Sequence, residues 1–89
     1  MNWTVKLSSK AEKYYLRLDT DIRGRIKREL VTLSEHENPL QHAQVKPLVG
    51  ELRGFCRLRV GPYRVIFSLL KDEHTIAVVN IVPRGEAYR

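Results

Sequence analysis

Arginine recurs at close spacing in the segment "RLRVGPYR", at positions 57, 59 and 64. Guanidinium groups bind phosphate oxygens through paired hydrogen bonds, and they keep their positive charge at physiological pH. Several of them on one surface would stabilise the negative charge that builds up on a phosphoryl group under attack. The residue types and their spacing therefore indicate chemistry on a phosphodiester.

The sequence ends on "IVPRGEAYR", which adds Arg84, Tyr88 and Arg89. Pro83 cannot donate to a sheet ladder, so we expect strand pairing to cease there and the tail to turn back over the sheet. Nearby positive charge favours the phenolate form of a tyrosine, which makes Tyr88 a candidate general base. A base and a group of cations suffice for attack of an RNA 2′-OH on the adjacent phosphate, and this reaction requires no metal.

The pair Gly61-Pro62 fits a type II′ hairpin turn, in which only the first residue needs a positive φ. With this two-residue loop, Arg59 lies opposite Arg64, and Arg57 projects from the same face of the sheet. Like charges in opposed positions destabilise a sheet by about 0.2–1 kcal/mol, so the cluster predicts an anionic ligand. The alternative is a structural network in which nearby glutamates pair with these arginines.

Periodicity predicts one strand, two helices and then three strands. Residues 3–7 alternate between apolar and polar, as in a half-buried strand. The capping box Ser9–Glu12 opens the first helix, and Asp19–Asp21 offers an N-cap for the second. Residues 40–54 look like an irregular connection. The final strands are expected at residues 55–60, 63–70 and 75–82, the last of them apolar enough to be covered on both faces.

This order predicts an α+β fold: an N-terminal strand, a two-helix hairpin on one face of an antiparallel sheet, and a three-stranded antiparallel meander. A length of 89 residues predicts a single domain spanning residues 1–89. The second helix carries an apolar stripe, and we interpret its basic face, from Arg23 to Arg28, as solvated surface.

Sixteen lysines and arginines against ten acidic residues give a net charge of +6, which favours a nucleic acid or an acidic protein as partner. No apolar run approaches the roughly 20 residues of a membrane span, and a single cysteine, Cys56, excludes a disulfide framework. We expect a cytoplasmic protein. His36, His42 and His74 have no recognised ligand spacing, so we predict that they are solvated and that the protein needs no metal or other cofactor.

The segment "LRGFCRLRVGPYRVIF", a short turn, an apolar strand and the tail "PRGEAYR" together resemble the RelE/ParE toxin superfamily of type II toxin–antitoxin systems, in its RelE-like branch. The resemblance implies a compact toxin that a cognate antitoxin protein wraps and neutralises. It also implies a metal-independent endoribonuclease that cuts mRNA in the ribosomal A site through a 2′,3′-cyclic phosphate, so that the ribosome and mRNA are further partners.

Carried over residue by residue, the resemblance implies two sets of functional residues. The catalytic set comprises Arg64, Arg84 and Tyr88. The set that binds RNA or phosphate comprises Arg57, Arg59, Lys46 and Arg89. Many relatives have a His-Arg-Arg type tail, whereas Pro83 and Gly85 flank the arginine here, which removes one acid–base candidate.

Two other functions share parts of this pattern. ParE-like inhibitors of DNA gyrase act by protein binding; they resemble this chain in the hairpin but usually lack the terminal Arg–Tyr combination. A non-toxic nucleic-acid-binding module would want exposed aromatic residues among the arginines, and only Phe55 is expected on that face.

Overall fold

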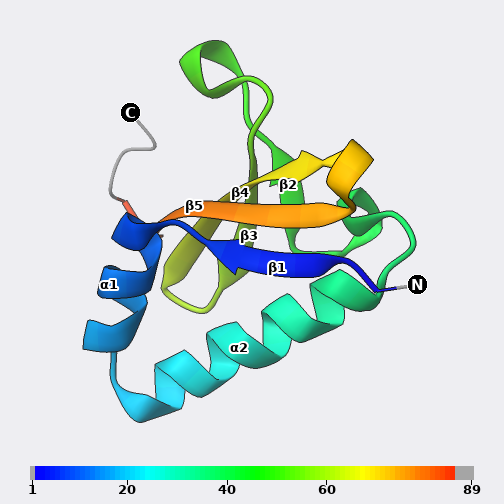
Figure 1. Cartoon of the computed structure of the whole chain (residues 1–89). Helices are drawn as coiled ribbons and strands as arrows, with labels where there is room; N and C mark the ends of the chain where they lie inside the picture. The colour runs from blue at the N-terminus through cyan, green and yellow to red at the C-terminus, as the bar shows by residue number, and fades with distance from the viewer. Residues whose placement is uncertain (1, 86–89) are drawn as a thin grey trace.

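The computed structural model describes residues 2–85. Its centre is a five-stranded mixed sheet with the strand order β1-β5-β4-β3-β2. Two helices, α1 and α2, lie on one face of this sheet (Figure 1), which confirms the predicted α+β class. In chain order the elements are β1 (Thr4–Leu7), α1 (Ser9–Arg17), α2 (Thr20–Glu35), β2 (Val45–Pro47), β3 (Cys56–Val60), β4 (Tyr63–Leu70) and β5 (Thr75–Pro83).

The first strand pairs in parallel with the last, with Thr4 beside Thr75 and Leu7 beside Val78. An antiparallel arrangement of the whole sheet was the expectation, and for β1 it is wrong. Parallel neighbours need a long connection, which the two helices and the other strands provide here. The meander β3–β4–β5 is antiparallel, as predicted.

A short strand, β2, lies within the segment that the sequence marks as an irregular connection. Val45 is buried and pairs with Leu58, while Lys46 pairs with Arg57. Three residues are too few for an alternating pattern to be recognised, so periodicity could not reveal this strand. It brings the residues around position 45 alongside the arginines of β3.

The hydrophobic core lies between the two helices and the sheet face that they cover. From α2 it receives Ile26 and Leu33, neither of which is exposed to solvent. The sheet contributes alternate residues of β3, β4 and β5, namely Leu58, Val60, Val65, Phe67, Ile76, Val78 and Ile81. The predicted apolar stripe of the second helix is therefore the core-facing one.

A β-bulge in β5 changes which of its residues face the core. Ile66 pairs with Asn80 but the next residue, Phe67, pairs with Val78, so Val79 is extra. Ile76 and Val78 face the core before the bulge and Ile81 does after it. The helices cover only one face of the sheet, so the apolar run of β5 reflects this change of side rather than helices on both faces.

The β3–β4 hairpin has the predicted register. Val60 pairs with Tyr63 and Arg59 pairs with Arg64, so Gly61-Pro62 is a two-residue loop. Gly61 has a φ of 55°, in the left-handed region that the first position of a type II′ turn requires. The side chains of Arg59 and Arg64 consequently project from the same face of the sheet.

Helix α1 is capped one residue earlier than its sequence predicts. Ser8, not Ser9, is the N-cap: its Oγ accepts a hydrogen bond from the backbone N–H of Ala11 at 3.1 Å. The same hydroxyl donates to the carbonyl of the bulged residue, Val79, at 3.0 Å. The side chain thus joins the start of α1 to β5, a tertiary contact that made Ser8 the better cap. Asp19 is the N-cap of α2, as predicted, without a side-chain hydrogen bond.

These contacts predict that Ser8→Ala lowers the free energy of unfolding by about 1–2 kcal/mol, because one cap and one further hydrogen bond are lost. Ser9→Ala is the matched control: Ser9 is exposed in the first turn, and its replacement should change stability by less than about 0.5 kcal/mol. Urea unfolding followed by circular dichroism measures both values. A larger loss for Ser9→Ala would contradict the assignment of the cap.

Candidate active site

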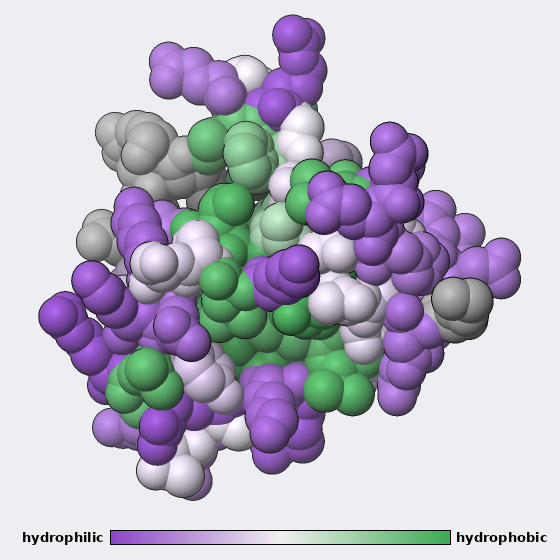
Figure 2. Space-filling view, in the orientation of Figure 1, coloured by the Kyte–Doolittle hydropathy of each residue, from purple (hydrophilic) through white to green (hydrophobic). Residues whose placement is uncertain are grey.

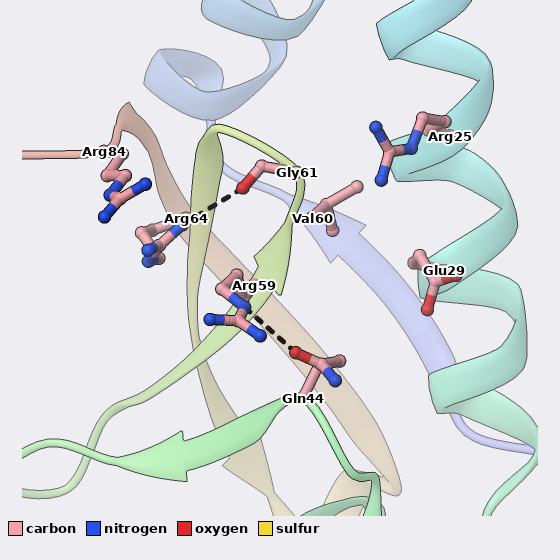
Figure 3. A pocket seen from close by; sticks show the side chains of 8 residues that line it. All are labelled: Arg25, Glu29, Gln44, Arg59, Val60, Gly61, Arg64 and Arg84. Carbon is pink, nitrogen blue, oxygen red and sulfur yellow. Dashed lines mark hydrogen bonds between the residues drawn. The ribbon is translucent and has the colours of Figure 1, made fainter.

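A pocket of about 450 Å³ opens at the turn end of the β3–β4 hairpin. Among residues 2–85, the lining includes four arginines and one acidic residue, Glu29. The lining residues are Arg25, Glu29, Gln44, Arg59, Val60, Gly61, Arg64 and Arg84 (Figure 3). Such a lining attracts anions, since the positive charges of these described residues outnumber the negative ones four to one.

The two opposed arginines of the hairpin are held by neutral oxygen atoms. Arg59 donates through Nε to Oε1 of Gln44 at 3.0 Å. Arg64 donates through Nη1 to the carbonyl of Tyr63 at 3.1 Å and, more weakly, to that of Gly61 at 3.4 Å. No carboxylate of residues 2–85 forms an ion pair with either of them, so the alternative of a structural glutamate network is not observed in this part of the chain.

Arg84 reaches the pocket because the end of β5 stays attached to the hairpin turn. Pro83 is the last residue of the strand and lies opposite Tyr63. The backbone N–H of Arg84 then donates to the carbonyl of Pro62 at 2.6 Å. Figure 3 shows the side chains of Arg64 and Arg84 on the same side of the hairpin, with Arg25 and Glu29 beyond it on α2.

Arg57 and Lys46 lie on the same face of the sheet as Arg59, but outside the pocket. They face each other across the β2–β3 pair, one step further from the turn. Arg57 is half-buried and donates through Nη1 to the carbonyl of Gln44 at 2.9 Å. Three of the predicted phosphate-binding residues, Lys46, Arg57 and Arg59, therefore lie on one face of the sheet, and of these Arg59 lines the pocket. Tyr88 and Arg89 fall outside the described residues.

Sequence reasoning missed Arg25, which it assigned to the solvated face of α2. Its guanidinium group lies against the hairpin turn, where a Cβ added to Gly61 would approach Nη1 of Arg25 to 2.8 Å. Arg25 and Glu29 are four residues apart and thus share one flank of the helix. That spacing was a usable signal, but only the packing of α2 beside the hairpin shows that this flank faces the arginines.

Gln44 and His42 were missed as well, and for His42 the prediction of a solvated side chain is wrong. Only 8% of its surface is exposed. Its Nδ1 accepts from the backbone N–H of Gln44 at 2.9 Å, which leaves Nε2 to donate to Oε1 of Glu29 at 3.3 Å. His74 stacks on Trp3, with ring centroids 4.1 Å apart. Both side chains have structural partners.

Cys56, the single cysteine of the sequence, is buried on the core face of β3. Burial raises the pKa of its thiol, because desolvation disfavours the thiolate. The chemistry that the described pocket can perform is thus electrostatic: it can bind a phosphoryl group and stabilise additional negative charge on it.

A family model described as ParE toxin of type II toxin-antitoxin system, parDE, matches residues 5–88. Among curated proteins, Toxin RelE of Mycobacterium tuberculosis is 33% identical over 48 residues, which are 54% of this chain. The match spans 50% of that relative, so the chain covers half the length of the curated protein that it resembles.

Solved structures share the whole fold. The RelBE2 toxin–antitoxin complex of Mycobacterium tuberculosis contains a chain with a TM-score of 0.81 at 24% identity, covering 97% of this chain and 95% of that one. The archaeal RelE–RelB complex from Pyrococcus horikoshii contains a chain with a TM-score of 0.78 at 28% identity, and the match covers 98% of this chain and 100% of that one. The isolated E. coli RelE toxin has a TM-score of 0.76 at 15% identity, and the match covers 97% of this chain and 88% of that one.

The likenesses at 24% and 15% identity are evidence for the fold alone. The family model, in contrast, matches nearly the whole sequence, including the hairpin and the residues that follow β5. The chain therefore belongs to the ParE toxin family of type II toxin–antitoxin systems, within the RelE/ParE toxin superfamily.

Proposed function

We propose that this protein is a toxin of the RelE-like kind, which cuts mRNA on the ribosome and so arrests translation in the cytoplasm. The observation that carries the proposal is the pocket at the hairpin turn, where Arg59, Arg64 and Arg84 converge without a carboxylate partner among residues 2–85. Cations without a carboxylate partner around a cavity of about 450 Å³ suit a phosphodiester. The nucleotides that flank this phosphodiester can lie along the basic surface of Arg57 and Lys46 beside the pocket. In this proposal residues 1–89 act as one toxin domain.

The reaction would begin with attack of the ribose 2′-OH on the adjacent phosphate. In our scheme Arg64 and Arg84 contact the phosphoryl oxygens and stabilise the additional negative charge. Tyr88 takes the proton of the 2′-OH as general base, and the bond between phosphorus and the 5′-oxygen breaks. The expelled 5′-oxygen takes a proton from water, so the products are a 2′,3′-cyclic phosphate and a free 5′-OH. The scheme needs no metal ion, since the guanidinium groups supply the positive charge.

Other basic residues would hold the RNA backbone on either side of the scissile linkage. Arg59 lines the pocket, while Arg57 and Lys46 continue the positive surface along the sheet. Arg89 is assigned to the same role from its place in the tail. Contacts of this kind position the backbone but carry no sequence information.

A second candidate function is inhibition of DNA gyrase by protein binding, because the family model that matches the chain is described by the name ParE. Such an inhibitor has no need of a cavity lined by arginines. The pocket therefore favours the nuclease, and the two functions differ in which nucleic acid is damaged.

We further propose that the cognate antitoxin binds beside β1. An apolar groove of about 350 Å³ lies there between the strand and the helices. It is lined by Val5, Leu7, Tyr15, Lys27, Leu30, Val31 and Ser34. β1 is an edge strand, so its outer edge is free to pair with an added segment.

Figure 2 shows apolar side chains gathered in the middle of this face, between hydrophilic ones. Such a surface fits an amphipathic segment whose acidic side chains complement the net charge of +6. Among the described residues, no helix combines the length and the apolar character of a membrane span.

Arg64→Ala and Arg84→Ala should each reduce mRNA cutting by about 100-fold or more, because each removes a cation that stabilises charge on the phosphoryl group. Primer extension on mRNA from ribosomes exposed to each variant measures the cuts. Arg53→Ala is the control, since Arg53 is exposed and does not line the pocket, and it should cut like the unaltered protein. Intact mRNA together with DNA breaks, produced by the unaltered protein, would instead establish the gyrase function.

Tyr88→Phe should abolish cutting but leave RNA binding unchanged, since only the phenolic oxygen is lost. Single-turnover cleavage on programmed ribosomes, measured over a range of pH, separates the cutting step from RNA binding. Cutting by Tyr88→Phe at the rate of the unaltered protein would show that another group is the base.

Val31→Glu should weaken antitoxin binding by about tenfold or more, because a groove residue that is 48% exposed loses apolar contact worth about 1.5 kcal/mol. Val49→Glu is the matched control, because Val49 is 84% exposed and outside the groove. Isothermal titration with the product of the neighbouring antitoxin gene measures both. Equal affinities for the two variants would place the antitoxin elsewhere.

A further inference from the structure

One residue, Gln44, contacts both arginines of β3. Its backbone carbonyl accepts hydrogen bonds from the backbone N–H of Arg59 at 3.0 Å and from Nη1 of Arg57 at 2.9 Å. Its side-chain Oε1 accepts from Nε of Arg59 at 3.0 Å, the bond that Figure 3 marks with a dashed line. Three donors from two arginines therefore end on this residue, which also lines the pocket.

Gln44 is in turn held from the interior of the protein. Its backbone N–H donates to Nδ1 of His42, whose ring is buried, and the other ring nitrogen contacts Glu29 on α2. Helix α2 is fixed by its core residues, such as Ile26 and Leu33. A chain of contacts thus runs from a packed helix through His42 to the guanidinium groups.

The chemical type of the acceptor matters at this position. An amide oxygen orients a guanidinium group through a hydrogen bond and leaves its charge available to a ligand. A carboxylate would hold Arg59 equally well, but it would cancel the charge that an anionic ligand needs. An oriented but unneutralised arginine is what a phosphate site requires.

From these contacts we propose that Gln44 is a positioning residue, which holds Arg57 and Arg59 in the path of a polyanionic ligand and is itself set by the Glu29–His42 pair. The inference rests on the proposed function only in taking RNA as that ligand. It assigns no catalytic step to Gln44 and requires none to be observed.

The test measures binding of the full chain, freed of antitoxin, to a short single-stranded RNA with 2′-O-methyl groups, which cannot be cut. Fluorescence anisotropy at several salt concentrations gives the Kd and the slope of log Kd against log salt. Gln44→Glu should reduce this slope by about one unit, since Arg59 becomes paired and no longer neutralises a phosphate. The melting temperature should be retained, because the new carboxylate still accepts from Arg59.

Gln41→Glu is the matched control, with the same change of charge on an exposed glutamine outside the pocket. It should leave the slope unchanged. A second variant, Gln44→Met, has a side chain of similar shape without the amide oxygen. It should raise the Kd and leave the slope of log Kd against log salt unchanged, because Arg59 keeps its charge but loses its orientation. This variant tests the proposal even where Gln44→Glu is poorly folded.

An unchanged slope for Gln44→Glu, an equal fall for Gln41→Glu, or an unaltered Kd for Gln44→Met would each overturn the positioning role. These results do not depend on RNA cutting. An unaltered protein that binds the RNA as expected but never cuts mRNA on ribosomes would refute the proposed function and leave the role of Gln44 standing.

Discussion

Two positive charges face each other across the β3–β4 hairpin, and much of the site depends on this opposition. Gly61-Pro62 permits only a tight turn, and the turn places Arg59 opposite Arg64. Such a pair is unfavourable in a sheet unless something offsets the repulsion. In residues 2–85 the offset comes from carbonyl and amide oxygens rather than from carboxylates. The positive potential is thereby retained in the pocket.

The rest of the fold holds this hairpin in position from three directions. Helix α2 brings Arg25 against the turn, the segment before β2 brings Gln44 beside Arg59, and the end of β5 brings Arg84 through its bond to Pro62. Each of these elements is anchored by residues on its other side, in the core or in the sheet. The pocket is therefore assembled from distant parts of the chain on a rigid support, as electrostatic stabilisation of a reacting phosphate requires.

The two surfaces proposed to be functional differ in chemistry. The pocket at the hairpin turn is lined by arginines and suits a polyanion, whereas the groove beside β1 is lined mainly by aliphatic residues and suits an amphipathic protein segment. Within residues 2–85, the two linings have no residue in common. In the proposed function, RNA and the antitoxin therefore bind to different parts of the surface.

Elements whose signals are local can be predicted from the amino-acid sequence alone. The hairpin, its register and the shared face of Arg57, Arg59 and Arg64 follow from a two-residue turn and from the alternation of side chains along a strand. The strand β2, the parallel pairing of β1 and the positions of Arg25 and Gln44 beside the hairpin arginines depend instead on tertiary packing. They arise where segments far apart in the chain pack together, and neither periodicity nor residue type records which flank of a helix, or which edge of a sheet, will meet which neighbour.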